Sequence, residues 1–498
     1  MTFQIPIDCL NEIIEYLEED RHTLYSCLLV NRLWCEISVR ILWRNIVYKD
    51  IQSFEHDKLF ELVDSSILNT LFTCLPNESK GLLYQIEIFI STPISKRPLF
   101  NYATFCKALS IFKIKRMVDN VFKFEPSINS LNIKDRNCLV TNELIKMFAN
   151  QIFSLKKLSY YHYPINFSFP YFPGMRDLSE LHCCSCLPSK FFHQLSQLCQ
   201  NLQSISISFC DGDISNELKE LISLQNNLQT LTLKLVAEKS SRDIIPILEK
   251  RSNTITKLHL YSNNDNLSYS FVSSFTNLQE FIFSLMGGIN IENFNILRYV
   301  NFSKLQTLKI PYQCPNPEDI MKFLENNGKN LKKFYIEENY KELHLSIPIL
   351  CPNLKSLFLL FYKNDLDSLK TILINCQYLE SLKIWCGKGY SNEYLPEKEV
   401  LEIVANHSSN NFCELKIHNL SNSEVSVDDL ESFFLSWRNR IPKKLLSLIT
   451  IKDNCKCLDD YEENMEIIEK YENLGIVRFR TISYEGDERE EEVSYYYN

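Results

Sequence analysis

The amino-acid sequence predicts an α/β fold in which a small three-helix module precedes a long solenoid of strand-and-helix repeats. Two observations carry this prediction. An apolar-x-x-apolar-x-apolar pattern recurs through most of the 498 residues, and three amphipathic stripes occupy the first fifty. The composition, 45% hydrophobic and 23% charged, is typical of a folded chain with ample material for a core.

The three-helix module is expected within residues 1–48. Its apolar residues recur at the three- and four-residue spacing of a helix that buries one face. So short a segment buries too little apolar surface to be stable alone, and we expect it to dock on something else. The three stripes are Leu10, Ile13, Ile14 and Leu17; Leu24, Cys27, Leu28 and Leu29; and Trp34, Ile37, Ile41 and Leu42.

Residues 49–125 are interpreted as a connector and N-terminal cap of the solenoid, because the open end of a repeat array needs covering. Within this segment, the run LLYQIEIF at 82–89 predicts a strand, and residues 105–118 predict a helix. Both elements are expected to belong to the cap.

The solenoid itself is expected over residues 126–452. Each copy ends in a short alternating strand, and the residues that follow return the chain as a helix. Counted at the first apolar residue, ten successive intervals are 23 to 27 residues long, and the last two are 33 and 34. The copies begin at Ile128, Leu155, Leu178, Leu202, Leu228, Ile255, Leu278, Leu305, Leu331, Leu354, Leu379, Phe412 and Leu446.

One return helix can be predicted in detail. Asn316 is a favourable N-cap, Pro317 is a favourable first residue, and Gly328 can end the helix. The apolar face of this helix and that of the next are formed by Ile320, Phe323 and Leu324, and by Leu369, Ile372 and Leu373.

The spacing resembles that of leucine-rich repeats, in particular their cysteine-containing subtype of about 26 residues. In that subtype a Cys often stands three residues before the first Leu, as in Cys199–Leu202, Cys351–Leu354 and Cys376–Leu379. Phe and Ile frequently replace Leu in this chain. The resemblance implies a horseshoe with parallel strands on its concave face and helices outside, followed by a C-terminal cap and acidic tail at 453–498.

The N-terminal segment resembles an F-box. Ile5-Pro6 matches the Leu-Pro start of that family, the run LVNRLW ending at Trp34 matches its Val-x-[Lys/Arg]-x-Trp core, and Leu42-Trp43 matches its closing Leu-Trp. The resemblance implies docking on a Skp-type adaptor and, through it, on a cullin. The alternative is that these residues only form the module's own core. The residues implied at the adaptor interface are Pro6, Leu10, Ile13, Ile14, Leu17, Val30 and Trp34.

The formal net charge of −9 is local. Residues 453–498 hold 14 Asp and Glu against 5 Lys and Arg, which leaves 48 residues of each sign in the rest of the chain. We interpret the acidic end as solubilising, with an acidic docking segment as the alternative. Neither nucleic acid nor a membrane is expected as a partner. Because the start resembles no secretory signal, the 18 Cys are expected to be reduced thiols of a cytoplasmic or nuclear protein.

The sequence gives no sign of covalent chemistry. The patterns GxGxxG, GxxxxGK[ST], HExxH and GxSxG do not occur, and the nine His are scattered. No catalytic residue, cofactor or metal site is therefore expected, and the chain is not expected to be an enzyme. A zinc site at the run HCCSC ending at Cys186 would need a second ligand pair, and Cys455 and Cys457 lie far along the chain. These thiols are interpreted as small buried hydrophobes.

The strand side chains that face away from the core form the candidate substrate surface. In the later copies they are aromatic rings and lysines, a composition typical of interface hot spots, and we expect a partner with apolar anchors and acidic neighbours. The alternative is that they pack on one another or on a terminal loop. The residues expected to bind substrate are His259, Tyr261, Lys309, Tyr335, Phe358, Leu360, Lys383 and Trp385.

These expectations combine into a substrate-recognition adaptor of a Skp–cullin–F-box (SCF) ubiquitin ligase, which holds a protein substrate on its concave face. Two alternatives remain. One is a leucine-rich-repeat interaction scaffold that acts outside a ubiquitin ligase. The other is a regulatory enzyme such as a GTPase activator, which would need an exposed Arg, and the outward-facing strand rows contain none. The identity of the substrate, and whether its recognition needs phosphorylation or a small molecule, stay open.

Overall fold

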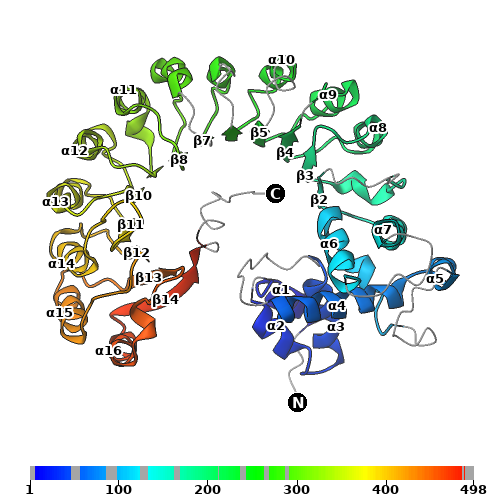
Figure 1. Cartoon of the computed structure of the whole chain (residues 1–498), viewed down its shortest axis with the longest axis horizontal. Coiled ribbons are helices and arrows are strands. Elements are labelled where there is room, and N and C mark those ends of the chain that lie inside the picture. The colour runs from blue at the N-terminus through cyan, green and yellow to red at the C-terminus, as the bar shows by residue number, and fades with distance from the viewer. Residues whose placement is uncertain are drawn as a thin grey trace. The chain divides into compact units, whose positions relative to one another are not determined.

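The chain divides into two compact units, residues 1–228 and 229–498, which are described in turn. Figure 1 labels their helices and strands. The computed structural model describes residues 6–18, 20–45, 57–85, 98–123, 133–161, 169–210, 212–235, 243–262, 269–285, 291–484 and 487.

The described part of unit 1 begins with helices and then alternates strands with helices. Its α-helices are α1 (Ile7–Glu15), α2 (Arg21–Cys27), α3 (Arg32–Leu42), α4 (Asp57–Cys74), α5 (Asn77–Gln85), α6 (Ile111–Val121), α7 (Ile133–Gln151), α8 (Ser189–Leu198) and α9 (Asn216–Ser223). Its strands are β1 (Ala108–Ser110), β2 (Lys157–Tyr160), β3 (Glu180–Cys184) and β4 (Ser204–Phe209), and its 3-10 helices are η1 (Tyr102–Phe105) and η2 (Pro173–Asp177).

The first three helices form the predicted module. Asp20 caps α2 by accepting a hydrogen bond from Thr23 N at 3.0 Å, and Asn31 caps α3 by accepting one from Trp34 N at 3.0 Å. These caps fix where each helix begins, so the apolar stripes face one another. The buried core of the module consists of Leu10, Ile14, Leu24, Ile37 and Ile41, with Leu17, Leu33, Trp34 and Leu42 packed against it.

The backbone that follows α3 fixes the module to the sheet of unit 1. The carbonyl of Arg44 accepts hydrogen bonds from the N–H groups of Lys107 and Ala108, at 2.7 and 3.0 Å. The same pair of bonds recurs at the next strand, where the carbonyl of Lys107 accepts from Lys156 N and Lys157 N at 2.8 and 3.0 Å. The end of the module therefore continues the ladder of the sheet instead of hanging on a free linker.

Unit 2 continues the alternation of strand and helix. Its strands are β5 (Thr230–Leu235), β6 (Lys257–Ser262), β7 (Glu280–Leu285), β8 (Thr307–Ile310), β9 (Lys333–Ile336), β10 (Ser356–Phe358), β11 (Ser381–Cys386), β12 (Glu414–Asn419), β13 (Leu446–Lys452) and β14 (Val477–Ser483). Its α-helices are α10 (Ile245–Lys250), α11 (Pro317–Asn327), α12 (Lys341–Leu350), α13 (Leu366–Asn375), α14 (Glu397–His407), α15 (Val427–Arg438) and α16 (Glu462–Asn473). Its 3-10 helices are η3 (Tyr269–Ser274), η4 (Ile291–Tyr299), η5 (Gly328–Asn330) and η6 (Leu458–Asp460). Among the described helices of either unit, none combines the length and apolar character that a membrane span needs.

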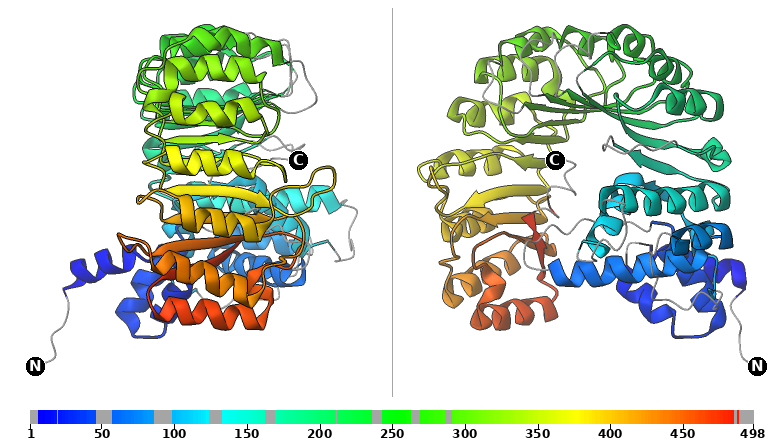
Figure 2. Two further views of the ribbon diagram at one scale, coloured as in Figure 1. Left: turned by 90° about the vertical axis from the view of Figure 1, so that its left-hand side faces the viewer. Right: turned by 45° about the vertical axis from the view of Figure 1, so that its right-hand side comes forward.

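The strands form one parallel sheet of 14 strands in chain order, which confirms the α/β repeat fold. Between Leu155 and Phe412 the register pairs equivalent positions of neighbouring copies within each unit, as in Leu231 with Leu258 and Leu258 with Phe281. Over this range the first two apolar residues of each copy are buried, as in Leu228 and Leu231. Figure 2 shows the helices of unit 2 stacked in a row on one side of their strands. This is the strand-and-helix stacking that the leucine-rich-repeat resemblance implies.

The structure differs from the prediction at the start of the array. The first strand is β1, inside the predicted helix 105–118, and it pairs directly with β2 through Leu109 and Leu158. Of the copy predicted at Ile128, residues 128–132 lie outside the described residues and α7 follows from Ile133. Of the strand predicted at 82–89, residues 82–85 belong to α5 and the rest lies outside the described residues. For residues 82–85 the prediction was wrong, because a short apolar run fits one face of a helix as well as a strand.

The structure also differs at the C-terminal end. After β13 the chain forms α16 and then β14, which pairs with β13 and extends the sheet. Repeat-like elements therefore extend into the predicted C-terminal cap. The copy predicted at Leu446 is out of register by one residue, because Leu415 pairs with Leu448. Because Leu445 and Leu446 are both apolar, the pattern can be aligned to begin at either of them. The interval before them is longer than the regular repeat and does not decide between the two alignments.

The return helix predicted after Asn316 is α11. Asn316 Oδ1 accepts a hydrogen bond from Glu318 N at 3.0 Å, as an N-cap should. The last residue of the helix, Asn327, is buried; its Oδ1 accepts from Phe302 N at 2.6 Å and its Nδ2 donates to Val300 O at 2.8 Å. A side-chain amide thus satisfies the backbone where one repeat turns against the next.

Candidate functional site

Four of the predicted adaptor-binding residues are part of the module's own packing. Leu10 and Ile14 are 3% and 0% exposed and belong to its core. Leu17 and Trp34 are partly buried against that core. Their packing is accounted for by the module itself, so a polar substitution at Leu10 would test folding before it tested binding.

The other three predicted residues, Pro6, Ile13 and Val30, are exposed. The exposed fractions of Ile13 and Val30 are 50% and 56%, although both side chains are apolar. Four further exposed side chains on the same module were not predicted at the interface. The signal was present, because some of the apolar residues of α1 fall outside the stripe that its core uses. The four are Ile7, Tyr16, Tyr25 and Leu29.

In unit 2, the register brings five of the eight predicted substrate-binding residues into one row across neighbouring strands. The row passes through Ile282 between β6 and β8 and is otherwise continuous from β6 to β11. Tyr261, Leu360 and Trp385 lie two residues further along their own chains. The five residues of the row are His259, Lys309, Tyr335, Phe358 and Lys383.

The aromatic part of this face is covered rather than exposed. The ring centroids of Tyr335 and Phe358 are 4.3 Å apart, and those of Phe358 and Trp385 are 6.0 Å apart. Tyr394, from the loop after β11, lies with its centroid 5.6 Å from that of Trp385 and completes the cluster. The expectation of an exposed aromatic patch is therefore not met, because these rings pack on one another, on Leu360 and on this loop.

Two buried lysines meet one aspartate next to this cluster. Lys383 and Lys416 are register partners on β11 and β12, and their side chains are only 6% and 8% exposed. Asp487 of the acidic tail is fully buried; it forms an ion pair with Lys383 and lies 3.5 Å from Lys416 Nζ. Lys383 Nζ also lies 5.3 and 5.0 Å from the ring centroids of Tyr335 and Phe358. The site thus holds a carboxylate between two ammonium groups, one of which lies beside aromatic rings.

The row starts at a second charged group. His259 Nε2 lies 2.7 Å from Glu280 Oε1, and Lys257 Nζ lies 3.9 Å from the other carboxylate oxygen. Burial raises the pKa of Glu280, but the hydrogen bond with His259 and the neighbouring positive charges hold it below its usual value. In the same row Lys309 is buried, and Tyr261, two residues beyond His259, is half-buried. The two ends of the row therefore both pair a basic group with a carboxylate.

Two register partners on β11 and β12 carry buried polar atoms without a hydrogen bond. Within the described residues, neither the ring nitrogens of His418 nor the Nε1 of Trp385 have a hydrogen-bond partner. Burial, with Lys383 nearby, lowers the pKa of His418 to about 3, so the ring is neutral. Burial also raises the pKa of Glu337 to about 7. Buried polar groups without a hydrogen bond are uncommon in folded proteins.

The structure brings a third thiol, that of Cys210, to two thiols of the HCCSC run. Cys184 is the last residue of β3, Cys186 lies two residues beyond it, and Cys210 follows β4; their sulfur atoms all lie within 4.8 Å of one another. Cys186 and Cys210 stand at the same position of neighbouring repeats, eight residues after Leu178 and Leu202. That equivalence was the signal in the sequence, because equivalent residues of adjacent parallel strands lie about 4.8 Å apart.

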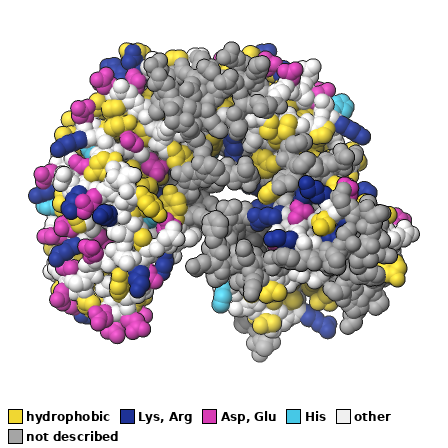
Figure 3. All heavy atoms as spheres, viewed as in Figure 1, with side chains coloured by type: hydrophobic (Ala, Val, Ile, Leu, Met, Phe, Trp, Pro, Cys, Tyr) yellow, Lys and Arg dark blue, Asp and Glu magenta, His cyan; other side chains and the backbone are white. Residues whose placement is uncertain are grey.

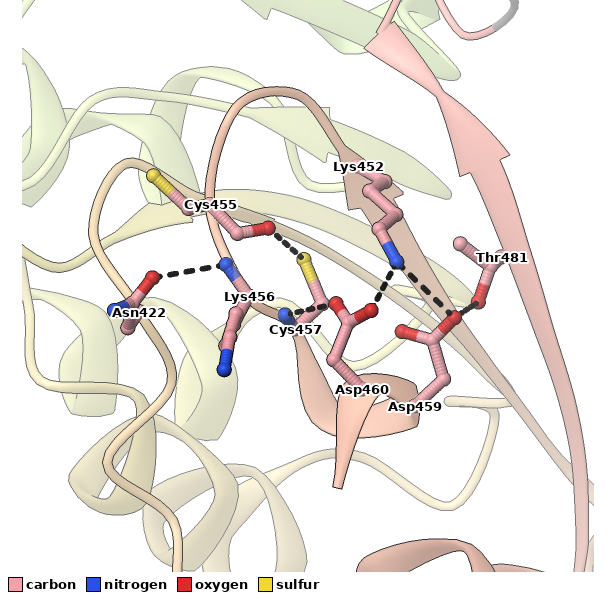
Figure 4. A network of polar contacts seen from close by, with 8 residues as sticks. All are labelled: Asn422, Lys452, Cys455, Lys456, Cys457, Asp459, Asp460 and Thr481. Atoms are coloured by element: carbon pink, nitrogen blue, oxygen red, sulfur yellow. Dashed lines mark hydrogen bonds and ion pairs between the residues drawn. The ribbon is translucent and has the colours of Figure 1, made fainter. Parts of the chain in front are cut away.

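The second cysteine pair considered in the sequence belongs to a different kind of network (Figure 4). Asp460 accepts a hydrogen bond from Cys457 N at 2.8 Å, and its other oxygen pairs with Lys452 Nζ at 2.5 Å. Asp459 accepts from Thr481 Oγ1 at 3.0 Å. The ammonium of Lys452 contacts both carboxylates, so this group acts as a structural clasp between β13, η6 and β14.

The acidic residues of 453–498 are not confined to the end of the chain. Five of them lie on α16, and Figure 3 shows Asp and Glu side chains gathered over the end of unit 2 that carries this helix. Lys470 on the same helix pairs with Glu431 of α15 at 2.5 Å. Much of the local negative charge is thus a solvated helix face, and within the described residues Asp487 is the one acidic residue of the run 486–492.

Comparison with known proteins gives little beyond this geometry. No family profile matches the chain, and no curated protein matches it in sequence. A solved structure with some likeness is the crystal structure of the Rad7 and Elc1 complex in yeast, at 12% identity and a TM-score of 0.36, over 93% of this chain and 96% of that chain. At that similarity the likeness carries no argument about fold or function.

Proposed function

We propose that the chain is a substrate-recognition adaptor of an SCF-type ubiquitin ligase. In this proposal α1–α3 bind a Skp-type adaptor and, through it, a cullin, while the strand face of unit 2 binds a protein substrate. The observation that carries the proposal is a small helical module whose core is complete but which still exposes six large apolar side chains. Together with the F-box resemblance of its sequence, this supports docking on an apolar partner surface.

The free energy gained by burying these apolar side chains favours such docking. Burying one exposed Leu, Ile or Val side chain contributes about 1.5–3 kcal/mol. Ile13, Leu29 and Val30 are 50%, 89% and 56% exposed, so each has surface left to bury. Because the backbone after α3 joins the ladder of the sheet through Arg44, an adaptor bound to the module would be held firmly relative to the sheet of unit 1.

The strand face of unit 2 supports a partner of defined chemistry. A carboxylate already lies on Lys383 and Lys416 beside the aromatic cluster, and it comes from the chain itself as Asp487. A substrate with an acidic residue next to an apolar one would satisfy the same groups, after displacing Asp487. This agrees with the expected partner that presents apolar anchors with acidic neighbours.

In the proposed role the chain performs no covalent chemistry and needs no cofactor. It raises the effective concentration of a substrate lysine near the transfer machinery, which is how a tether accelerates a reaction. It would do so where adaptor and cullin are found, in the cytoplasm or nucleus. The scaffold alternative uses the same strand face but makes no use of an adaptor, so adaptor binding separates the two.

The decisive experiment is co-purification of the full chain with a purified Skp-type adaptor. The double variant Ile13→Asp/Val30→Asp places charge on exposed positions and leaves the core intact. Interface hot spots contribute at least about 2 kcal/mol each, so we expect the affinity to fall at least about 100-fold. Leu99→Asp/Phe153→Asp is the matched control, because these residues of unit 1 are 81% and 83% exposed outside the module.

Two results would overturn the ligase proposal. One is the absence of adaptor binding by the wild-type chain, which would favour the scaffold. The other is an equal loss in the control and in the Ile13/Val30 variant, which would show that the exposed apolar residues of the module have no special role. Circular dichroism of each variant shows whether its helices are intact.

A further inference from the structure

The three thiols at the ends of β3 and β4 are arranged as a set of ligands. Cys184 Sγ lies 2.6 Å from Cys186 Sγ and 2.9 Å from Cys210 Sγ. Cys184 is buried, whereas Cys186 and Cys210 are half-buried. Other cysteines of this unit are used differently, since the Sγ of Cys199 donates to Met175 O at 3.0 Å as a satisfied buried thiol.

We propose that Cys184, Cys186 and Cys210 bind one Zn²⁺ ion through three thiolates, with no fourth ligand supplied by the residues that the structure describes. Thiolates are the ligands that Zn²⁺ and other soft ions prefer, and three protein ligands leave one tetrahedral position for water or for a ligand from another molecule. The Zn–S distance of about 2.3 Å requires sulfur atoms about 3.8 Å apart. The thiols therefore have to separate by about 1 Å, which side-chain rotation alone can achieve.

The backbone holds the ligands in place before any ion arrives. Ser185, between the first two cysteines, donates its N–H to Ser208 O at 2.9 Å. Its hydroxyl in turn accepts a hydrogen bond from Cys210 N at 3.1 Å. The loops after β3 and β4 are thus tied together at the residues that flank the sulfur atoms. Binding an ion therefore costs these loops little conformational freedom.

A metal ion binds thiolates and not thiols, so each cysteine gives up its proton when the ion binds. The affinity of the site for the ion should therefore rise with pH.

The charge of the site favours a divalent ion. Three thiolates carry three negative charges, of which Zn²⁺ leaves one and Cu⁺ leaves two. Because an uncompensated charge is costly to bury, the half-buried site holds Zn²⁺ with the smaller desolvation cost.

Titration of the full chain with Co²⁺, which reports thiolate ligation through its absorbance, tests the site. The protein is first treated with reductant and a chelator. We expect one equivalent to bind with sulfur-to-metal charge-transfer bands and to be displaced by Zn²⁺. Cys184→Ser and Cys210→Ser should each weaken binding at least about tenfold, since even second-shell changes at metal sites cost that much. Cys413→Ser, a half-buried cysteine of unit 2, is the control and should bind normally.

X-ray absorption of the Zn²⁺-loaded chain gives an independent measure, with three sulfur neighbours at about 2.3 Å and one lighter atom expected. The proposal is overturned by unchanged Co²⁺ binding in both Ser variants, or by a metal coordination shell without three sulfur atoms. It is also overturned if, in protein prepared without reductant, a disulfide among these cysteines blocks their alkylation. If Cys184→Ser fails to fold, the half-buried Cys186→Ser and Cys210→Ser carry the test.

Discussion

The carboxylate of Asp487 should be what makes the buried lysine pair tolerable. Lys383 and Lys416 stand side by side on β11 and β12 with side chains that are 6% and 8% exposed. At the 3.5 Å between Lys416 Nζ and Asp487 Oδ1, opposite unit charges attract by about 5 kcal/mol at an effective dielectric constant of about 20. Removing one partner of a buried pair costs about 3–5 kcal/mol, because the other charge stays desolvated. Asp487→Asn should therefore destabilise this region by about 3 kcal/mol.

The measurement is backbone hydrogen exchange of β11 and β12, followed by mass spectrometry. A loss of about 3 kcal/mol corresponds to an opening equilibrium that is about 150-fold more favourable, and protection should fall by that factor. Lys383→Met should have an effect of similar size. In the double variant the two losses should not add, and we expect a coupling free energy of about 2 kcal/mol.

The exposed pair Lys355–Glu380 serves as the matched control. Its atoms are 2.7 Å apart and its side chains are 48% and 45% exposed, so solvent screens the charges. The same cycle of single and double variants should give a coupling free energy below about 1 kcal/mol there. If the Lys383–Asp487 cycle were additive within about 0.5 kcal/mol, the aspartate would not be the counter-ion of the lysines and the reasoning would fail.

Two further predictions concern stability. Burial raises the pKa of Glu337 to about 7 from 4.5, so the free energy of unfolding should fall as pH rises through that window. Glu337→Gln should remove about 3 kcal/mol of that fall. Urea denaturation at pH 5 and pH 8 measures it, and an equal change in the free energy of unfolding of wild type and variant would contradict the prediction. Asn327→Leu should cost about 3 kcal/mol, because Phe302 N and Val300 O lose their buried partner. A urea midpoint equal to that of the wild type would refute the bridging role of the amide.

The sequence was informative where one physical rule acts alone. Alternation and spacing place Leu231, Leu258 and Phe281 in register, since a strand with one buried face needs an apolar residue at every second position. The same alternation correctly puts Lys383 and Trp385 on the opposite side of the sheet from the core. Whether that side is open to solvent is decided by other segments, and no local pattern predicts that the loop carrying Tyr394 covers it.

In the N-terminal module too, the sequence predicts the buried residues better than the exposed ones. Its stripes predict the core residues Leu10 and Ile14 well, because helical periodicity reports which face is buried. Periodicity does not report which apolar residues stay exposed, and the proposed adaptor binding depends on two of these, Ile13 and Val30. The cysteine site was missed for a different reason. Its ligands are neighbours across the repeat, whereas the usual metal patterns count residues along the chain.

A repeat of nearly constant length brings like residues together whether or not they are compatible. Cys186 and Cys210 become neighbours in this way, and so do Lys383 and Lys416. Two ammonium groups on strands about 4.8 Å apart repel each other, and the row cannot relieve this because it continues with Phe358 on one side and Ile449 on the other.

The counter-charge must therefore come from outside the row. Glu337 contributes at most part of it, since burial holds its pKa at about 7. Asp487 supplies the charge from beyond the last strand, in a run of acidic residues. Any partner that places its own carboxylate on the lysines has to compete with Asp487 for the same two ammonium groups. Binding of such a partner and docking of Asp487 exclude each other, so the acidic end of the chain sets the threshold that a partner has to exceed.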